Sequence, residues 1–281
     1  MIRTIHADQI ADCVAELCVK ACTVLPEQVR SLLSEAQLRE PYPPARESLT
    51  LVCENCKIAE QSQIPICQDT GVAVVLAEVG QDVHIEGGLL EEAVNRGVGR
   101  GYTDGYLRKS VVRDPLHRVN TGDNTPAALH VRLVAGDKIK LTVAPKGFGS
   151  ENMSRLKMLT PADGLPGVKD FVLETVRLAG ANPCPPVILG VGIGGTFEQV
   201  ALLAKEALIE LREGGHPDPA IDALEDELLE EINRMGIGPQ GYGGLTTALA
   251  VRIKTAPTHI AGLPVAVNVG CHATRRAVGF V

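Results

Sequence analysis

The 281-residue chain has few aromatic side chains, and tryptophan is missing altogether. Aromatic residues make up 3% of the composition, so the core must be aliphatic, and stacking on nucleic-acid bases is not expected. A surplus of basic residues is missing as well. The formal net charge is -7, which argues against a general binder of polyanions. We therefore expect no nucleic-acid partner.

Long apolar runs are also missing. No stretch reaches the roughly 18 apolar residues that a membrane span requires. The first residues, MIRTIHADQIADC, show no apolar core or cleavage site of a signal peptide. These absences predict a cytoplasmic protein with no membrane partner. In that compartment the eight cysteines should be reduced thiols or metal ligands rather than disulfides.

What is present predicts a mixed α/β (α+β) fold in a single domain, 1–281. Apolar residues at steps of three and four predict three helices in a helical N-terminal part, about 1–62. Beyond it, in a part of about 63–281, buried or alternating apolar runs predict a mixed sheet flanked by helices. The expected strands cover about 72–79, 128–134, 138–146, 187–193, 246–255 and 263–270.

Three segments carry predictions of their own. Residues 128–147 read as two strands joined in a hairpin by a Gly-Asp turn. Residues 88–102 predict a short helix that runs into a glycine-rich loop. Residues 222–231, DALEDELLEE, carry six acids on another helix, which we expect to form a solvated or partner-facing surface.

Five of the eight cysteines fall in the three N-terminal helices: Cys13, Cys18, Cys22, Cys53 and Cys56. The last two form CENC, the spacing of many zinc and redox sites. No second such pair exists to complete a four-ligand zinc site, and no strand precedes this one as a thioredoxin-like motif requires. We expect these five to behave as small buried hydrophobic residues.

The other three cysteines, Cys67, Cys184 and Cys271, stand at predicted strand-loop junctions with glycine or proline nearby. Such loops present backbone N–H groups that stabilise thiolates and bound sulfides. Three thiolates would leave one iron of a four-iron cluster open, as Lewis-acid chemistry requires, whereas an electron carrier usually has every iron capped by protein. Spacing alone does not select these three from the eight.

Polar and basic residues accompany these cysteines. Gln68 and Asp69 follow Cys67 directly, and His259 precedes Cys271 by twelve residues. A basic segment, defined as residues 108–118, carries five basic side chains, and two arginines follow Cys271: Arg108, Lys109, Arg113, His117, Arg118, Arg275 and Arg276. Such a basin suits a small dicarboxylate, which arginine binds in bidentate fashion. The simpler interpretation of each arginine is a surface ion pair, and that of Asp69 is a turn cap.

The segment GVGIGG places Gly190, Gly192 and Gly195 in the G-x-G-x-x-G pattern after a strand and before a helix. That pattern occurs in dinucleotide-binding folds. Such a fold also has a second strand that ends in an acidic residue, and the sequence shows no strand of this kind at the expected distance. An NAD-binding Rossmann enzyme is therefore a distant alternative, since a glycine loop can equally hold a carboxylate or allow close packing.

Five segments in this order, CQDTG, LRKSVV…NTGDNTPA, KGFGSENMS, NPCPPVILGVGIGGT and GCHATRRA, resemble the iron-sulfur (class I) fumarate hydratase and L-tartrate dehydratase family. They match its alpha subunit, or N-terminal domain, from about residue 45 to the end. One departure is Phe148, which stands where the glycine run of the family has a third glycine.

The resemblance implies a [4Fe-4S] cluster held by Cys67, Cys184 and Cys271. It implies substrate contacts from Gln68, Asp69, Arg108, the Gly149 backbone and His259, with Asp69 and His259 in catalytic roles. The implied reaction is the reversible hydration of fumarate to L-malate. Its hard step, removal of a carbon-bound proton next to a carboxylate, needs a base and strong stabilisation of the resulting anion.

The chain ends ten residues after Cys271, where longer family members continue into a second domain. The resemblance therefore implies a beta subunit that supplies the catalytic base, in an α2β2-type oligomer. The nearest alternative is the alpha subunit of L-tartrate dehydratase, which converts tartrate to oxaloacetate. An electron-transfer iron-sulfur protein is a more distant one.

Overall fold

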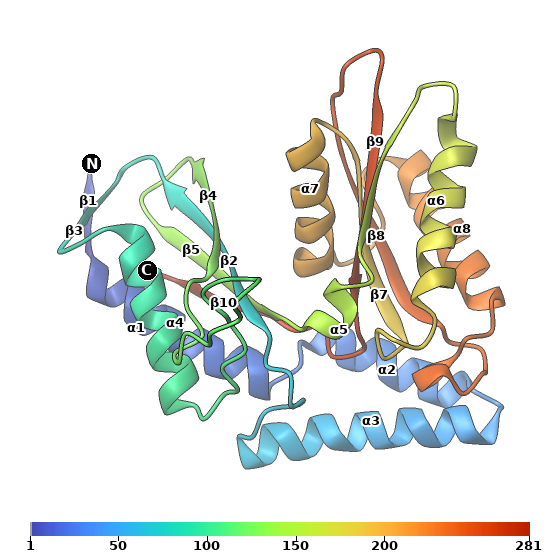
Figure 1. Cartoon of the computed structure of the whole chain (residues 1–281), viewed down its shortest axis with the longest axis horizontal. Coiled ribbons are helices and arrows are strands. Elements are labelled where there is room, and N and C mark those ends of the chain that lie inside the picture. Colours follow the sequence, from blue (N-terminus) through green and yellow to red (C-terminus); the bar gives the residue numbers. More distant parts are fainter. Residues whose placement is uncertain (1) are drawn as a thin grey trace. The chain divides into compact units, whose positions relative to one another are not determined.

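The computed structural model describes residues 2–281, and its helices and mixed sheets confirm the predicted α/β class (Figure 1). The chain forms two compact units. The first unit comprises Met1–Pro26, Asn55–Phe148 and Arg275–Val281, and the second unit comprises Glu27–Glu54 and Gly149–Thr274. The boundary near residue 62 that the sequence suggests falls inside the first unit.

A four-stranded sheet with the order β10-β5-β2-β4 organises the first unit. Strand β2 pairs in parallel with β4 and antiparallel with β5, which pairs antiparallel with β10. A short parallel pair, β1-β3, lies outside this sheet, and β1 was not predicted. The strands are β1 (Arg3–His6), β2 (Val72–Gly80), β3 (Val83–Glu86), β4 (Ala128–Val134), β5 (Ile139–Lys146) and β10 (Ala277–Phe280).

The predicted hairpin of β4 and β5 is wrong, because β2 lies between these two strands. The Gly-Asp turn does not fold back on itself. It crosses the end of β2, where Asp82 N donates to Gly136 O at 2.9 Å and Gly80 N to Lys138 O at 2.9 Å. A side chain at Gly80 would lie 2.4 Å from the Gly136 carbonyl oxygen, so glycine is needed at this crossing.

Helices α1 (Ala7–Thr23) and α4 (Leu90–Asp104) pack together and share a core with the sheet. The predicted glycine-rich loop at the end of α4 is wrong, since the helix continues to Asp104. Its glycines form the contact with α1. A side chain at Gly97 would lie 2.6 Å from Ala11 O, and one at Gly101 would lie 2.7 Å from Ala15 O. Close helix packing therefore outweighs the low helical propensity of glycine here.

The second unit contains a four-stranded sheet with the order β6-β9-β7-β8. Strand β7 pairs in parallel with β8 and antiparallel with β9, and β9 pairs antiparallel with β6. Helix α7 covers one face, and α6 and α8 cover the other (Figure 1). The strands are β6 (Arg155–Leu159), β7 (Val187–Gly194), β8 (Ala248–Ala256) and β9 (Leu263–Gly270); the helices are α6 (Gly164–Ala179), α7 (Phe197–Glu210) and α8 (Pro219–Arg234).

The remaining predicted N-terminal helices are also present. Helix α2 (Glu27–Arg39) belongs to the second unit, and α3 (Pro43–Ser62) runs from the second unit into the first. Short elements complete the chain, namely α5 (Phe148–Glu151) and the 3-10 helix η1 (Pro239–Gly241). The sequence periodicity therefore located the long elements correctly.

The glycine pattern 190–195 serves packing between β7 and α7. A side chain at Gly190 would lie 2.1 Å from Ala204 O, and one at Gly192 would lie 2.3 Å from Val200 O. Both glycines lie within the strand rather than in a phosphate-binding loop. Their role in close packing removes the main observation behind the NAD-binding alternative.

The acidic run on α8 is only partly a solvated face. Glu225 has a side chain with 2% exposure and accepts bonds from Ile253 N at 2.7 Å and from Arg212 at 2.8 Å. Arg252 lies 3.3 Å from the same carboxylate. The expected solvated surface is wrong at this position, because two arginines and a backbone N–H compensate the buried charge.

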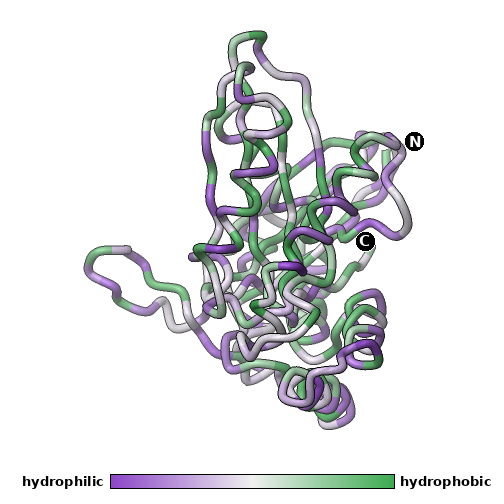
Figure 2. Tube along the Cα trace, turned by 90° about the vertical axis from the view of Figure 1, so that its right-hand side faces the viewer, coloured by the Kyte–Doolittle hydropathy of each residue, from purple (hydrophilic) through white to green (hydrophobic). Residues whose placement is uncertain are grey.

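Hydrophobic and hydrophilic residues are interspersed along the trace (Figure 2). Among residues 2–281, no helix combines the length and the apolar character that crossing a bilayer demands.

Candidate active site

Residues 67–71, CQDTG, form a tight turn in the first unit, here called the CQDTG turn. The chain enters it at Ile66, whose N–H donates to Cys22 O at 2.9 Å and whose carbonyl accepts from Asn55 Nδ2 at 2.8 Å. Asp69 N donates to Cys67 Sγ at 3.4 Å, and the thiol lies 3.3 Å from Gln68 Oε1. A backbone N–H directed at sulfur is the kind of contact that loops around metal-bound or cluster-bound sulfur provide.

The Asp69 carboxylate holds the turn together. Its Oδ1 accepts from Gly71 N at 2.9 Å, and its Oδ2 accepts from Phe148 N at 2.9 Å. The structure thus supports the capping interpretation of Asp69. Each carboxylate oxygen keeps a further lone pair for another donor, so capping leaves room for the substrate contact that the family resemblance implies.

The carbonyl groups of the turn are fixed by two fully buried polar side chains, Tyr102 and Asn124. Tyr102 Oη donates to Thr70 O at 2.7 Å, and Asn124 Nδ2 donates to Gly71 O at 3.0 Å. Burial raises the pKa of Tyr102 well above 10, so it remains a donor. Our sequence reasoning missed both residues, although the quoted motif NTGDNTPA contains Asn124.

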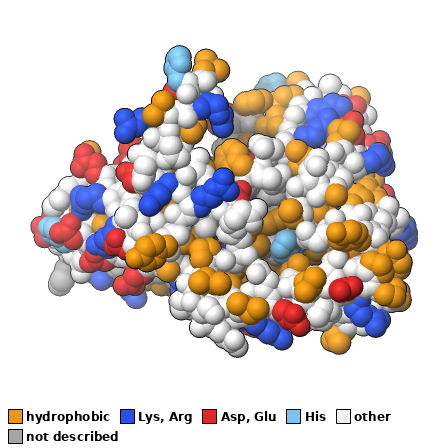
Figure 3. All heavy atoms as spheres, turned by 60° about the horizontal axis from the view of Figure 1, so that its bottom comes forward, with side chains coloured by type: hydrophobic (Ala, Val, Ile, Leu, Met, Phe, Trp, Pro, Cys, Tyr) orange, Lys and Arg blue, Asp and Glu red, His pale blue; other side chains and the backbone are white. Residues whose placement is uncertain are grey.

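Arg108 is held at its backbone, because Thr70 Oγ1 donates to Arg108 O at 2.9 Å. Its side chain is exposed, as are Arg113, His117 and Arg118 in the basic segment. Arginine and lysine side chains stand beside acidic ones on the face drawn in Figure 3 rather than forming one basic surface. This pattern suits a small anion better than a polyanion.

Arg275 does not lie on the open basic surface that its position in the sequence suggests. It is 6% exposed, and its Nη2 donates to the carbonyl oxygen of Asp69. Its Nε is a buried donor without a hydrogen-bond partner. Arg275 therefore supports the CQDTG turn and places a buried positive charge beside it.

The second unit brings the loops of Cys184 and Cys271 together. Strand β7 begins beside the end of β9, with Ile188 opposite Gly270, so the two loops emerge at the same edge of the sheet. The ring Nδ1 of His272 lies 2.9 Å from Cys184 O, and His272 N donates to the same oxygen at 3.4 Å. The same ring nitrogen lies 3.2 Å from Gln240 Nε2, so the His272 ring contacts both the Cys184 loop and Gln240.

Gln240 also holds the Cys184 loop. Its backbone N–H and its Nε2 both donate to Pro185 O, each at 2.8 Å. Gln240 lies in a glycine-rich loop that is tied down by the fully buried Glu40, whose Oε2 accepts from Leu245 N at 2.7 Å. Our sequence reasoning missed Gln240, His272 and Glu40; the quoted motif GCHATRRA includes His272.

His259 and Gly149 both lie exposed in the second unit. His259 Nδ1 accepts from Ala261 N at 3.2 Å, which places the ring proton on Nε2. That tautomer presents an N–H donor to solvent. Gly149 lies in α5, where the nearest atom to an added side chain would be Asn182 O at 3.8 Å.

The predicted site residues divide between the units. Cys67, Gln68, Asp69 and Arg108 belong to the first, and Cys184, Cys271, Gly149 and His259 belong to the second. Over residues 2–281, no group of three or more His, Cys, Asp or Glu side chains is gathered as a metal site. The loops of Cys184 and Cys271 are adjacent, and Cys67 stands on a separately braced turn.

The chemistry of the cysteines fits a cluster on the three loop residues. None of the eight cysteines, all of which lie among residues 2–281, forms a disulfide; Cys184 is exposed, and Cys67 and Cys271 are half-buried. Burial raises the pKa of Cys18 far above its usual value and that of Cys22 to about 11. These two helix thiols are therefore poor ligands, because a ligand cysteine must release its proton.

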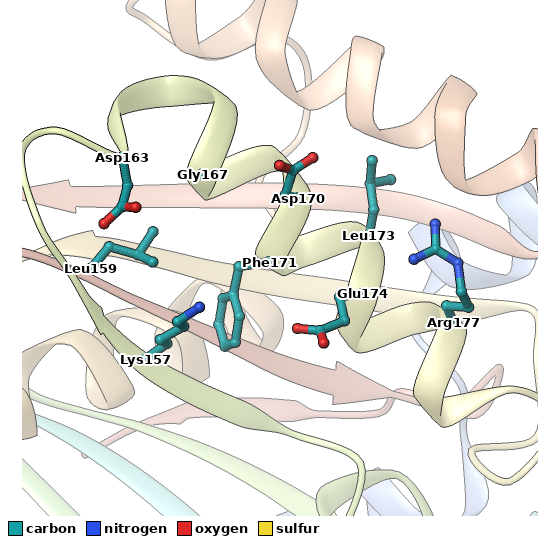
Figure 4. Close-up of a pocket in the computed structure, with 9 residues that line it drawn as sticks. All are labelled: Lys157, Leu159, Asp163, Gly167, Asp170, Phe171, Leu173, Glu174 and Arg177. Carbon is teal, nitrogen blue, oxygen red and sulfur yellow. The ribbon is translucent and has the colours of Figure 1, made fainter.

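A pocket of about 410 Å³ lies between β6 and α6, away from these cysteines (Figure 4). Two of its charged groups are engaged in structural contacts. Asp163 accepts from Thr160 N at 2.7 Å, and Glu174 pairs with Arg155 at 2.9 Å. Hydrogen bonds from Thr160 lower the pKa of Asp163 below its usual value. The pocket contains neither a cysteine nor a histidine and holds none of the predicted site residues.

Comparison with known proteins places this arrangement in a family. The sequence model described as "Fumarate hydratase (Fumerase)" matches residues 11–279. A protein of Methanocaldococcus jannaschii, provisionally named L(+)-tartrate dehydratase subunit alpha, is 43% identical over 276 residues, which cover 96% of each chain. The L(+)-tartrate dehydratase subunit alpha of Escherichia coli strain K12 is 31% identical over 278 residues, covering 98% of this chain and 91% of that protein.

These matches define an enzyme of the hydro-lyase class, which adds or removes water. More specifically, the chain belongs to the iron-sulfur fumarate hydratase and L-tartrate dehydratase alpha family. This membership confirms the resemblance drawn from the five sequence motifs. Proteins of the family are iron-sulfur hydro-lyases, and the name "subunit alpha" implies a beta partner.

Proposed function

We propose that this chain is the alpha subunit of a [4Fe-4S] hydro-lyase that interconverts fumarate and L-malate. The observation that carries the proposal is the CQDTG turn. There a cysteine, an amide and a carboxylate follow one another, and a backbone N–H is directed at the sulfur. The family match over residues 11–279 supports it. We propose further that residues 1–281 act as one functional domain.

The proposed ligands of the cluster are Cys67, Cys184 and Cys271. When bound, a cluster with one iron lacking a protein ligand supplies a Lewis acid for a substrate hydroxyl or water. The chain itself holds the three thiolates on braced loops. The buried charge of Arg275 next to the CQDTG turn favours an anion there.

The remaining proposed residues bind and orient the dicarboxylate. Arg108 holds a substrate carboxylate by bidentate hydrogen bonds. The Gly149 backbone N–H and the Nε2–H of His259 donate to substrate oxygens. Gln68 and Asp69 contact the substrate beside the cluster position. The carbon-bound proton is removed by a base on the partner chain, and Arg108 stabilises the negative charge that results.

L(+)-tartrate is the second candidate substrate, because the curated relatives carry the name L(+)-tartrate dehydratase subunit alpha. Tartrate loses water to give oxaloacetate, which is the same reaction type on a substrate with one more hydroxyl group. We place the enzyme in the cytoplasm and propose a beta subunit as its partner in an α2β2-type assembly.

The first test of the proposal is the iron and acid-labile sulfide content after anaerobic reconstitution. Wild type should hold about four irons per chain, and Cys67→Ser, Cys184→Ser and Cys271→Ser should each lose the cluster. Cys53→Ser, a half-buried cysteine of α3, is the matched control and should keep it. Iron loss in the control, or iron retention in all three variants, would overturn the ligand assignment.

The second test is activity with the beta partner supplied by co-expression. Fumarate hydration is followed by loss of its ultraviolet absorbance, and tartrate dehydration by coupled reduction of oxaloacetate. A higher kcat/KM for fumarate than for L(+)-tartrate supports the first candidate, and the reverse supports the second. Activity toward neither substrate in a cluster-loaded complex would refute both.

A further inference from the structure

The second unit contains a hydrogen-bonded network that is not among the predicted site residues. Glu151 ends α5, two residues after Gly149. Its Oε2 accepts from Asn268 Nδ2 on β9 at 2.8 Å, and its Oε1 is bound by Lys205 Nζ on α7. One carboxylate therefore ties the short helix α5 to both a sheet strand and a long helix.

The orientation of Asn268 is determined by its neighbours. Its side-chain amide donates to Glu151 Oε2 and, at 2.9 Å, to Ser154 Oγ, which also accepts from Val269 N at 3.0 Å. The residue is 6% exposed, and its Oδ1 has no hydrogen-bond partner. A flipped amide would place that oxygen against the Glu151 carboxylate, so the carboxylate selects the observed orientation. A buried, unpartnered carbonyl is destabilising, yet this arrangement includes one.

Helix α5 needs such a tether because it has little stability of its own. It spans four residues, which is too short for a helix to be stable in isolation. It contains a glycine at its second position, where the backbone is unusually free. A cavity of about 210 Å³ adjoins the network and is lined by Glu151, Ser154, Lys205 and Asn268. On the side of this pocket, the contacts of α5 are hydrogen bonds of Glu151 rather than close apolar packing.

The network also joins two parts of the proposed site. Asn268 lies on β9 three residues before Cys271, and Glu151 lies two residues after Gly149. We propose that Glu151 is a positioning residue that orients the Gly149 backbone through Asn268 and Lys205. Its consequence for dicarboxylate binding rests on the function proposed above, whereas the ordering of α5 does not.

Amide hydrogen exchange tests the ordering directly and needs neither cluster nor substrate. In Glu151→Gln and in Asn268→Leu, amides of residues 148–152 should exchange at least about ten times faster than in wild type. The matched control is Glu210→Gln: Glu210 lies on α7, as Lys205 does, and the change weakens its ion pair of 2.6 Å with Lys254 of β8. Its exchange at 148–152 should equal that of wild type.

The alpha-beta complex tests the functional consequence. KM for the dicarboxylate should rise about tenfold in Glu151→Gln, with iron content unchanged and kcat altered less. Unchanged exchange at 148–152 in both folded variants would overturn the positioning role. Faster exchange with an unchanged KM would overturn the link to substrate binding. If wild type carries no hydro-lyase activity, the proposed function fails, and the exchange measurement alone still decides whether Glu151 orders α5.

Discussion

The replacement of Asp69 by alanine should destabilise the first unit as well as abolish activity. The Asp69 carboxylate accepts hydrogen bonds from two backbone N–H groups, those of Gly71 and Phe148, each at 2.9 Å. The first closes the CQDTG turn, and the second ties this turn to the residues that follow β5. In the Asp69→Ala variant both donors lose their partner.

The size of the effect follows from the two bonds. A hydrogen bond to a charged acceptor contributes about 1.5–3 kcal/mol. Asp69 is half-buried, so water reaches the freed groups in part and the low end of that range applies. The two bonds together should contribute about 3 kcal/mol. At about 2–4 °C per kcal/mol for a domain of this size, Tm should fall by about 6–12 °C.

Thermal unfolding followed by circular dichroism measures this change. Asp69→Asn keeps one acceptor oxygen and turns an NH2 group toward the other N–H, so Tm should also fall, by about half as much or more. The matched control is Asp104→Ala, at the exposed end of α4, where Tm should stay within about 2 °C of wild type. An Asp69→Ala variant as stable as this control would refute the argument that the carboxylate organises the turn.

Two further predictions concern buried groups. Burial raises the pKa of Cys22 to about 11, so between about pH 9 and 11 the native thiol keeps a proton that the unfolded chain releases. The free energy of unfolding, measured with urea, should therefore fall as pH rises through that window. In Cys22→Ala it should fall less steeply with pH, and equal slopes in wild type and variant would contradict this. Glu225→Gln should lower the free energy of unfolding by about 3 kcal/mol, because it leaves Arg212 and Arg252 without their buried countercharge. Glu230→Gln, an exposed residue of the same helix, should change it by less than about 0.5 kcal/mol, and equal losses in the two variants would contradict the prediction.

Local sequence patterns predicted the long elements because their causes are local. The apolar spacing of α1 and the buried run of β2 appear in the structure where the periodicity places them. The glycines of α4 show where local reasoning fails. Gly97 and Gly101 look like helix breakers in sequence, but the approach of α1 keeps them helical. That contact joins segments about 85 residues apart, and no local window contains it.

The motifs supplied candidate site residues, but they did not indicate which residues support them. Cysteines at strand-loop junctions could be selected from their neighbours, because glycine and proline mark those junctions in sequence. The residues that brace them could not be selected in this way. Glu40 reaches the loop of Leu245 across about 200 residues, and Gln240 holds a carbonyl beside Cys184. The sequence around a glutamate or a glutamine does not indicate which distant segment it will bond.

By itself, the sequence determined the α/β class, the positions of the long helices and strands, and the family to which the chain belongs. These follow from residue spacing and motif order, which are visible in the sequence without any knowledge of long-range contacts. Tertiary structure alone decided that β2 separates β4 from β5. It also decided that Glu225 points inward and that Asp69 caps two segments far apart in the chain. Strand order and side-chain pairing depend on which distant segments meet, because the free energy of burial and hydrogen bonding is summed over the whole fold.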